Sequence, residues 1–494
     1  MNQPALPESG PDRFVFAGLV VLLLWLPLPW GSTSGWARDL FCTLAWLLLA
    51  AWLLQAVLGR AGLPPRPRRH AWALLIWLLW IGWIAGQMLA LPSGLLAELS
   101  PEAVRVHAAL AQVPGASARL TTSIAAGATA DALLLTLGYF ALYWLIVLSS
   151  AGTPGRVRLL LATLVVGGLA QALFGSLMTL SGVEYGLFGR KWFYLGSATG
   201  SFVNRNHFAG YLELTGAAAL ALVLAGLGKP LSGRSWRQLM RDTINLFFSD
   251  KIRARVALAV MVVGIVMSRS RMGNIAFFAS LCVCGLGYIV LRERALAFRA
   301  AVLFLSLLVV DTLIVSRWLG IGQVIERLER TDVAEEGRVQ LLEEIPPVID
   351  SFLWAGSGLG TFASAYAPHR SPRMHAWFDH AHNDYVELLV ETGVPGLALL
   401  LTLAGIHYLH AARLIVLRRR RFPAAVGFAT FMAMSAYGLH SLVDFNLQIP
   451  ANAATLVALM AMSACCSARA GAGEGVRRRE APDRDSSGDE VRPG

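Results

Sequence analysis

The stretch Ala71-Trp-Ala-Leu-Leu-Ile-Trp-Leu-Leu-Trp-Ile-Gly-Trp-Ile-Ala-Gly-Gln-Met-Leu-Ala-Leu91 contains no charged side chain. A run of about 20 apolar residues is long enough to cross the hydrocarbon layer of a bilayer as a helix. Lipid offers no partner for an open backbone N–H or C=O group, so such a run is expected to be helical. It therefore predicts a transmembrane helix, and similar runs recur along the chain.

The composition of the whole chain agrees with that prediction. Its 494 residues are 56% hydrophobic and only 15% charged, and the mean hydropathy is +0.56. A soluble globular chain has about 25% charged residues. This high share of hydrophobic residues and low share of charged residues exclude a soluble enzyme, a disordered protein and a secreted disulfide scaffold. They permit catalysis at a membrane face.

Apolar runs predict an all-α polytopic membrane protein with about twelve transmembrane helices. The predicted spans are Phe14–Trp30, Leu40–Leu58, Ala71–Leu91, Ala132–Ser150, Leu159–Leu180, His207–Leu227, Val256–Ser268, Met272–Leu291, Ala300–Val315, Val394–Val416, Phe422–Leu439 and Ala451–Ala468. Residues 1–315 then hold nine spans, 316–393 form a large external loop, and 394–468 hold three more spans. The composition of residues 469–494 predicts a disordered tail.

The formal charge of +11 predicts how the chain is oriented. Cytoplasmic loops of membrane proteins carry an excess of Lys and Arg. With the N-terminus in the cytoplasm, most of the 42 basic residues fall on the cytoplasmic side, including the run Arg418–Arg421. Both termini are therefore expected in the cytoplasm, and the basic excess indicates orientation rather than a nucleic-acid partner.

Two external segments are expected to carry structure. The loop at 316–393 has helical patterning that Pro346-Pro347 interrupts, and structured loops of this length are usually functional. The alternative is a cap without chemistry. Residues 92–131 are predicted to form amphipathic helices lying on the membrane.

Ser268-Arg269-Ser270-Arg271 follows an apolar run that is short for a full span, so both arginines are expected near the external surface. Such a position costs about 2.5–3.5 kcal/mol on insertion scales, which calls for an anionic partner. Guanidinium binds phosphate through paired N–H groups. The alternative is a pair of interfacial side chains that reach up to water.

Gly200-Ser-Phe-Val-Asn204-Arg205-Asn206-His207-Phe-Ala-Gly210 opens another span. A helix N-terminus favours anions, and Arg190 and Lys191 precede this stretch. The alternative is a helix cap made by Asn204 or Asn206, which is compatible with anion binding.

His380-Ala-His382-Asn383-Asp384 begins a further helix, and imidazole is suited to accept a proton near neutral pH. A metal site of Asp379, His380, His382 and Asp384 is the alternative, but it lacks the spacing of a known zinc motif, so we predict no metal. Asp444 lies between the last two spans, where it is predicted to pair with Arg271 or Arg205, the alternative being a polar helix cap.

His382-Asn383, followed after nine residues by Gly393-Val-Pro-Gly396, resembles the His-[Asn/Ser/Gln]-x9-Gly-x-x-Gly pattern of the O-antigen ligase and polymerase superfamily. The Gly200–Gly210 stretch, the Ser-Arg pair, the Gly337-Arg338 step and His440-Ser-Leu-Val-Asp444-Phe-Asn446 are similar to the same family. The resemblance covers about residues 200–452, while the first five spans match only in layout.

This resemblance implies a GT-C-like membrane glycosyltransferase of the bacterial inner membrane. Such enzymes take a glycan from undecaprenyl diphosphate at the periplasmic face. They transfer it to a lipid A-core sugar (ligases), a growing glycan (polymerases) or a protein (O-oligosaccharyltransferases). They use no nucleotide sugar, and the ligases need no metal, so no cofactor is expected.

Residue by residue, His382 matches the family's catalytic histidine, the proposed general base on the acceptor hydroxyl. Arg271 best matches the arginine that holds the diphosphate, with Arg269 as an alternative, and Arg338 matches an arginine of the large loop. The remaining family arginine corresponds to one of Arg190, Lys191 and Arg205. Supporting residues are expected to be Asn204, Asn206, His207, His380, Asn383 and Asp444.

The alternative from another class is a transporter of lipid-linked glycan. It predicts charged residues deep along the spans, and Asp311 is almost the only one that the sequence singles out. A glycosyltransferase is therefore favoured.

Overall fold

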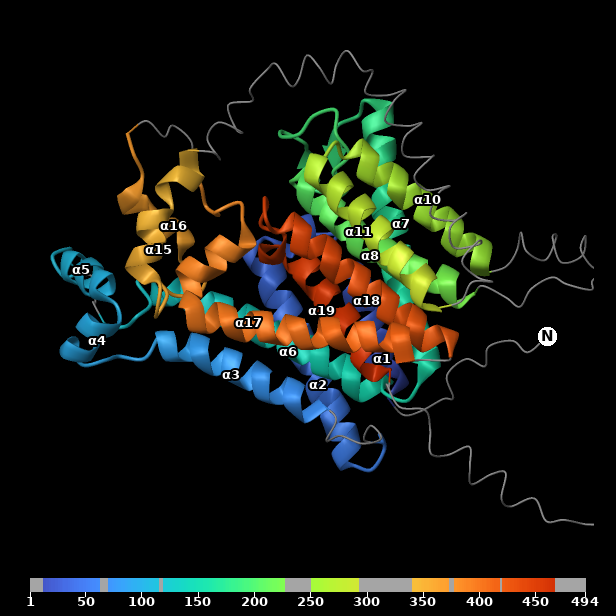
Figure 1. The fold of residues 1–494 in the computed structure, drawn as a ribbon, viewed down its shortest axis with the longest axis horizontal. Helices are drawn as coiled ribbons and strands as arrows, with labels where there is room; N and C mark the ends of the chain where they lie inside the picture. The colour runs from blue at the N-terminus through green and yellow to red at the C-terminus, as the bar shows by residue number, and fades with distance from the viewer. Residues whose placement is uncertain are drawn as a thin grey trace, which may run out of the picture.

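The computed structural model describes residues 12–62, 70–114, 119–226, 250–292, 340–372, 377–417 and 420–466, and these are almost entirely helical (Figure 1). The sheet within those ranges is one antiparallel hairpin of β1 (Tyr185–Gly186) and β2 (Gly189–Arg190). The longer helices are α1 (Arg13–Trp25), α2 (Gly35–Val57), α3 (Ala71–Gln87), α6 (Ala126–Ser150), α7 (Pro154–Ser181), α8 (Arg205–Ala225), α10 (Asp250–Met267), α11 (Arg271–Arg292), α17 (Asp384–Leu417), α18 (Arg421–His440) and α19 (Pro450–Cys465). The short helices are η1 (Trp30–Ser32), α4 (Ser93–Leu99), α5 (Pro101–Leu110), α15 (Pro346–Phe352), α16 (Phe362–Tyr366), η3 (Ala367–His369) and η4 (Asn446–Gln448).

The predicted spans correspond to helices wherever the structure describes them. The span predicted at Ala300–Val315, the tail at 469–494 and Arg338 lie outside the described residues. Seven of the described helices are long and apolar enough to cross a membrane, namely α2, α6, α7, α8, α11, α17 and α18. The helices α1, α3 and α19 are apolar but shorter. The chain is a multi-pass membrane protein.

Helix α8 is the centre of the bundle. Within its apolar window 89% is buried inside the protein, compared with 22% for α2. Small residues allow neighbouring helices to approach it closely: a Cβ atom added to Gly168 of α7 would clash with the Thr215 side chain of α8. Most of α8 is therefore surrounded by other helices, which fixes its position in the bundle.

Helices α4, α5, α15 and α16 gather at one end of the bundle, on the left in Figure 1. We call residues 93–110 and 340–369 the cap. The cap has its own hydrophobic core, which includes Leu96 and Ala103 from one segment and Phe352 and Phe362 from the other. We predicted amphipathic helices at 92–131; α4 and α5 form there, and their Leu96 and Ala103 pack into this core while Leu95 and Leu99 stay exposed. Helical periodicity alone does not reveal which apolar partner a face meets.

Helix α17 is broken at Gly393, close to the predicted boundary between the external loop and the membrane. Gly393 has φ 66° and ψ 179°, a backbone conformation that is essentially restricted to glycine. A Cβ atom there would lie 2.6 Å from the Trp354 carbonyl oxygen, and the Val394 N–H donates to Leu353 O at 2.8 Å. The residues before the break therefore belong with the cap, and those after it run along the bundle.

Candidate functional site

The start of α17 is tied to the link between α18 and α19. The Asn383 side-chain oxygen accepts hydrogen bonds from the N–H groups of Tyr385 and Val386 at 3.0 and 3.1 Å, so Asn383 caps α17. Its side-chain nitrogen donates to Leu442 O at 2.9 Å. The Ser441 hydroxyl donates to Asp384 Oδ2 at 2.7 Å. These hydrogen bonds hold the backbone at His382 in place, because His382 directly precedes Asn383.

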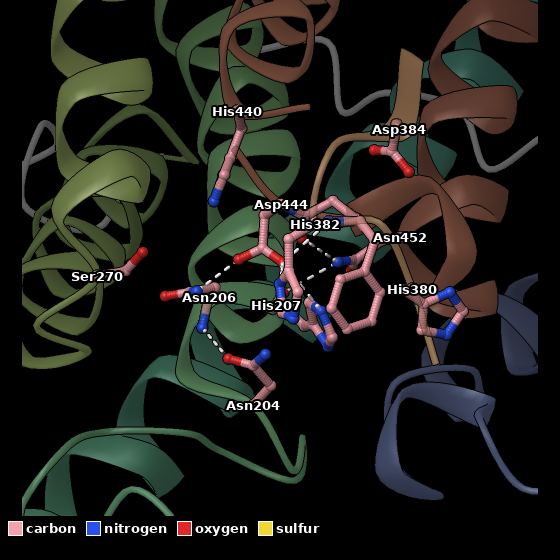
Figure 2. Close-up of polar contacts among 12 residues, drawn as sticks. Asn204, Asn206, His207, Ser270, His380, His382, Asp384, His440, Asp444 and Asn452 are labelled. Atoms are coloured by element: carbon pink, nitrogen blue, oxygen red, sulfur yellow. Dashed lines mark hydrogen bonds and ion pairs between the residues drawn. The ribbon is translucent and has the colours of Figure 1, made fainter. Parts of the chain in front are cut away.

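Asp444 joins three of the predicted residues, as Figure 2 shows. Its buried Oδ2 accepts a hydrogen bond from Asn206 Nδ2 at 2.5 Å. Its Oδ1 lies 3.7 Å from His207 Nε2 and 3.8 Å from His382 Nδ1. Asp444 Oδ1 also accepts the N–H of Phe445 at 2.9 Å; the expected pairing with Arg271 or Arg205 stays a prediction.

The pKa of Asp444 reflects these neighbours. Burial by itself would raise the pKa, but the adjacent imidazoles of His207 and His382, together with the charge of His440, lower it well below its usual range. The carboxylate is therefore ionised at neutral pH. An ionised carboxylate facing His382 Nδ1 favours the tautomer with the proton on that nitrogen, which makes Nε2 the proton acceptor.

Phe445 separates the histidines of the site. Its ring is stacked on His380 at 4.3 Å between centroids, and it meets His207 and His382 edge-on at 4.6 and 4.8 Å. The polar groups of the site are thus gathered around an apolar ring, which limits the space open to water.

His380 and His382 occupy different environments. His380 Nδ1 lies 2.7 Å from Glu387 Oε1, and the Ala381 N–H donates to the other oxygen of Glu387 at 2.9 Å. Burial would lower the pKa of His380, but the Glu387 carboxylate outweighs it and raises the pKa. His380 is thus engaged in an ion pair, whereas His382 faces Asp444 and is partly exposed.

Strained backbone is concentrated near this site. Among the described residues other than glycine, positive φ angles occur at Tyr194 (54°), Arg269 (55°) and His382 (50°), and also at Trp30 and Ser32 between α1 and α2. Such conformations cost free energy and often occur at functional sites. Two residues singled out from the sequence, Arg269 and His382, therefore adopt conformations that their neighbours must impose.

The Ser-Arg pair lies at a helix break, as predicted. Helix α10 ends at Met267 and α11 begins at Arg271. The Ser270 hydroxyl accepts the Gly273 N–H at 3.1 Å and so caps α11. Arg271 is exposed and Arg269 is partly buried.

The N-terminus of α8 has the same organisation. The Asn204 side chain accepts the Asn206 N–H at 2.8 Å, which identifies Asn204 as the cap. The Arg205 guanidinium lies 5.4 Å from the centre of the Tyr194 ring. Helix N-termini with adjacent arginines attract anions, so α8 and α11 both provide cationic ends.

Lys191 and Arg190 differ in their roles. Lys191 Nζ lies 3.0 Å from Glu184 and donates to Ser197 O at 2.6 Å, so it stabilises its own loop. Arg190 is exposed and lies 5.6 Å from the centre of the Trp192 ring. A Cβ atom at Gly196 would lie 3.7 Å from Arg269 Nη1, so this loop adjoins the helix break.

A second buried pair, between His440 and Glu213, was missed from the sequence. His440 Nδ1 of α18 lies 2.7 Å from Glu213 Oε1 of α8, and neither side chain is exposed. The sequence feature that could have indicated this pair is Glu213, a single acidic residue within an apolar run. Glu213 is thus a second acidic residue within a predicted span, in addition to Asp311, which lies outside the described residues.

Within the described residues, no group of three or more His, Cys, Asp and Glu side chains is arranged to hold a metal ion. The sequence spacing at Asp379–Asp384 therefore does not produce a ligand cluster there.

The family model described as O-antigen ligase matches residues 256–401. That segment includes Arg269, Arg271 and His382, whereas Arg205 and Asp444 lie outside it. No curated protein matches the chain.

Proposed function

We propose that the chain is a member of the O-antigen ligase superfamily, whose family model matches residues 256–401, and that it transfers a glycan from undecaprenyl diphosphate to a sugar hydroxyl, with lipid A-core as the acceptor. The reaction takes place at the periplasmic face of the bacterial inner membrane. Related alternatives within the superfamily are transfer to a growing glycan or to a protein.

The proposal rests above all on His382 beside Asp444. The Nδ1–Oδ1 distance of 3.8 Å is long for a hydrogen bond, and catalytic hydrogen bonds often shorten only when substrate is bound. Asp444 orients the imidazole, and Asn206 holds Asp444 in turn. His382 then accepts the proton of the acceptor hydroxyl at Nε2.

In the transfer step the acceptor oxygen attacks the anomeric carbon. The bond between that carbon and the phosphate oxygen breaks, and the lipid diphosphate leaves with the bonding electron pair. The hydroxyl proton passes to His382. Attack opposite the leaving group inverts the anomeric centre.

Arginines stabilise the departing diphosphate. Preorganised donors act most strongly on charge that develops in the transition state. The candidates among the described residues are Arg271 and Arg269 at the α10–α11 break, together with one of Arg190, Lys191 and Arg205 before or at the start of α8. Arg338 is a further candidate outside the described residues. Cations at the ends of apolar helices suit a substrate whose head group is polar and whose tail stays in lipid.

The test is transfer by purified protein from undecaprenyl diphosphate-linked glycan to a panel of acceptors: lipid A-core, free glycan and a pilin-type protein. New glycosidic bonds on lipid A-core support the proposal, and retention of activity with a chelator supports metal independence. Product only on free glycan or only on protein reassigns the acceptor. No product on any acceptor, with donor moving across proteoliposome membranes, would favour a transporter.

A further inference from the structure

The loop between α7 and α8 exposes a dense group of large apolar side chains. We call residues 183–195 the aromatic hairpin. Exposed fractions are 75% for Trp192, 68% for Phe193 and 60% for Tyr185. Val183, Leu187, Phe188 and Leu195 are also more than half exposed. A water-soluble surface seldom exposes so large an apolar patch, so the patch indicates a binding surface.

The aromatic hairpin continues a surface that already faces lipid. Along α7 the outward side chains Val166, Leu173, Leu177 and Leu180 are 43–62% exposed, as expected for the lipid side of a membrane-spanning helix. The hairpin follows directly after α7 ends at Ser181. It therefore emerges at the level where a span leaves the hydrocarbon layer.

Residue types in the aromatic hairpin suit that level. Trp and Tyr are enriched at the boundary between lipid and water, where an apolar ring meets lipid and its polar atom meets head groups. Arg190 is exposed above the Trp192 ring at 5.6 Å and carries charge opposite to that of anionic head groups. Phe188 packs on Trp30 at 4.5 Å, which adds an aromatic ring from the α1–α2 link.

The aromatic hairpin is also rigidly joined to the cationic site. Glu184 accepts the Gly196 N–H at 2.6 Å and pairs with Lys191 at 3.0 Å. Immediately after the hairpin, the Ala198 N–H donates to Met267 O at 2.9 Å, at the end of α10. A force on the hairpin is thus transmitted to the helix break that bears Arg269.

We propose that the aromatic hairpin is inserted into the head-group region of the bilayer leaflet at the capped end of the bundle, where it contacts anionic phospholipid. Insertion sets the depth of Arg205 and Arg269 at the level of lipid phosphates. The occupant is bilayer phospholipid rather than the isoprenoid tail of a donor or a second copy of the chain.

Depth-dependent quenching tests this placement in the full-length chain. The five cysteines (Cys42, Cys282, Cys284, Cys465 and Cys466) are replaced by alanine, and Trp192→Cys or Phe193→Cys is labelled with bimane. Each protein is placed in nanodiscs of phosphatidylethanolamine and phosphatidylglycerol that contain acyl chains brominated at carbons 6,7 or 11,12. Arg105→Cys on α5, whose side chain is 77% exposed, is the matched control.

We expect quenching at 192 and 193 to be at least twice that at 105, and stronger from carbons 6,7 than from 11,12. Quenching at both positions no greater than at 105 would overturn the proposal. Quenching that appears only after undecaprenyl diphosphate is added would assign the surface to the donor tail and would also overturn it. The readout requires no transfer reaction, so it is independent of the proposed function.

Discussion

His382 directly precedes Asn383, the cap of α17, faces Asp444 and has a positive φ angle. Its positive φ is held by the hydrogen bonds that Asn383 and Asp384 make with the α17 start and the α18–α19 link. A backbone conformation that costs free energy is kept in a protein where a side chain must point in a defined direction. The direction here is toward the carboxylate of Asp444.

Replacing His382 by alanine is expected to reduce transfer by about 10²–10⁴-fold, because the general base is lost. His382→Asn is the second variant, since asparagine tolerates the left-handed conformation better than alanine. Both should elute from gel filtration like the wild type. His369→Ala in the cap is the control and should retain activity. Unchanged transfer in both His382 variants would remove this residue from the mechanism.

Arg271→Lys is expected to lower transfer by roughly tenfold or more, because an ammonium lacks the planar fork that binds phosphate through paired donors. Arg269→Lys is measured beside it, so that the two arginines of the helix break are ranked directly. Arg105→Lys on the cap surface should have no effect. Equal activity of Arg271→Lys and the wild type would exclude Arg271 as the diphosphate clamp.

His380 gives the folded protein a pH-dependent stability. Its pKa is raised above 6.5 in the folded state, mainly by Glu387 against the opposing effect of burial. The ion pair therefore contributes fully below about pH 6.5, and its contribution is lost as the pH rises through the folded-state pKa. Thermal unfolding of the wild type should show this loss as the pH is raised above about 6.5. A His380→Gln variant that has the same pH slope as the wild type would contradict the assignment.

Among the helices, α17 has the clearest requirement for one residue type, which is glycine at position 393. Gly393 separates the site-bearing turns of the helix from its membrane part. Gly393→Ala should destabilise the protein by about 1–3 kcal/mol, because it combines an unfavourable φ with a close approach to Trp354 O. Gly405→Ala in the same helix, where a Cβ atom would meet nothing within 4 Å, is the control. Equal unfolding temperatures for the two variants would disprove the requirement.

Elements were predicted well where apolar runs are long. The runs that became α6, α7, α8, α17 and α18 were identified from length and hydropathy alone, because crossing a bilayer requires both. The break at Ser268–Ser270 was indicated by a short run followed by arginine. The packing of the two cap segments against each other was not predicted, because they are far apart in the chain and periodicity does not identify a packing partner.

The site was predicted in part. Paired polar residues at helix starts indicated Asn204, Asn206, His207 and His382, and the structure brings three of these to Asp444. The roles of Phe445 and Glu213 depend on contacts between helices that are distant in sequence. No local pattern encodes such contacts, so they were missed. The catalytic roles themselves remain predictions.

For the whole molecule, the basic residues predict both termini in the cytoplasm and the cap outside it. A phosphatase fused after Val113 should be active, and one fused after Gly62 should be inactive. Green fluorescent protein fused after Gly494 should fluoresce. An active phosphatase at the C-terminus would reverse the orientation and would place the site on the wrong side for a periplasmic reaction.

The Glu213–His440 pair has a consequence for biogenesis. Helix α8 leaves the ribosome long before α18, so its glutamate must meet the translocon before its histidine partner exists. A charged group at mid-span makes insertion costly on its own, and helices associate after they enter the bilayer. We therefore expect α8 to enter the membrane late or incompletely, and chains shortened before α18 to be substrates for membrane quality-control proteases.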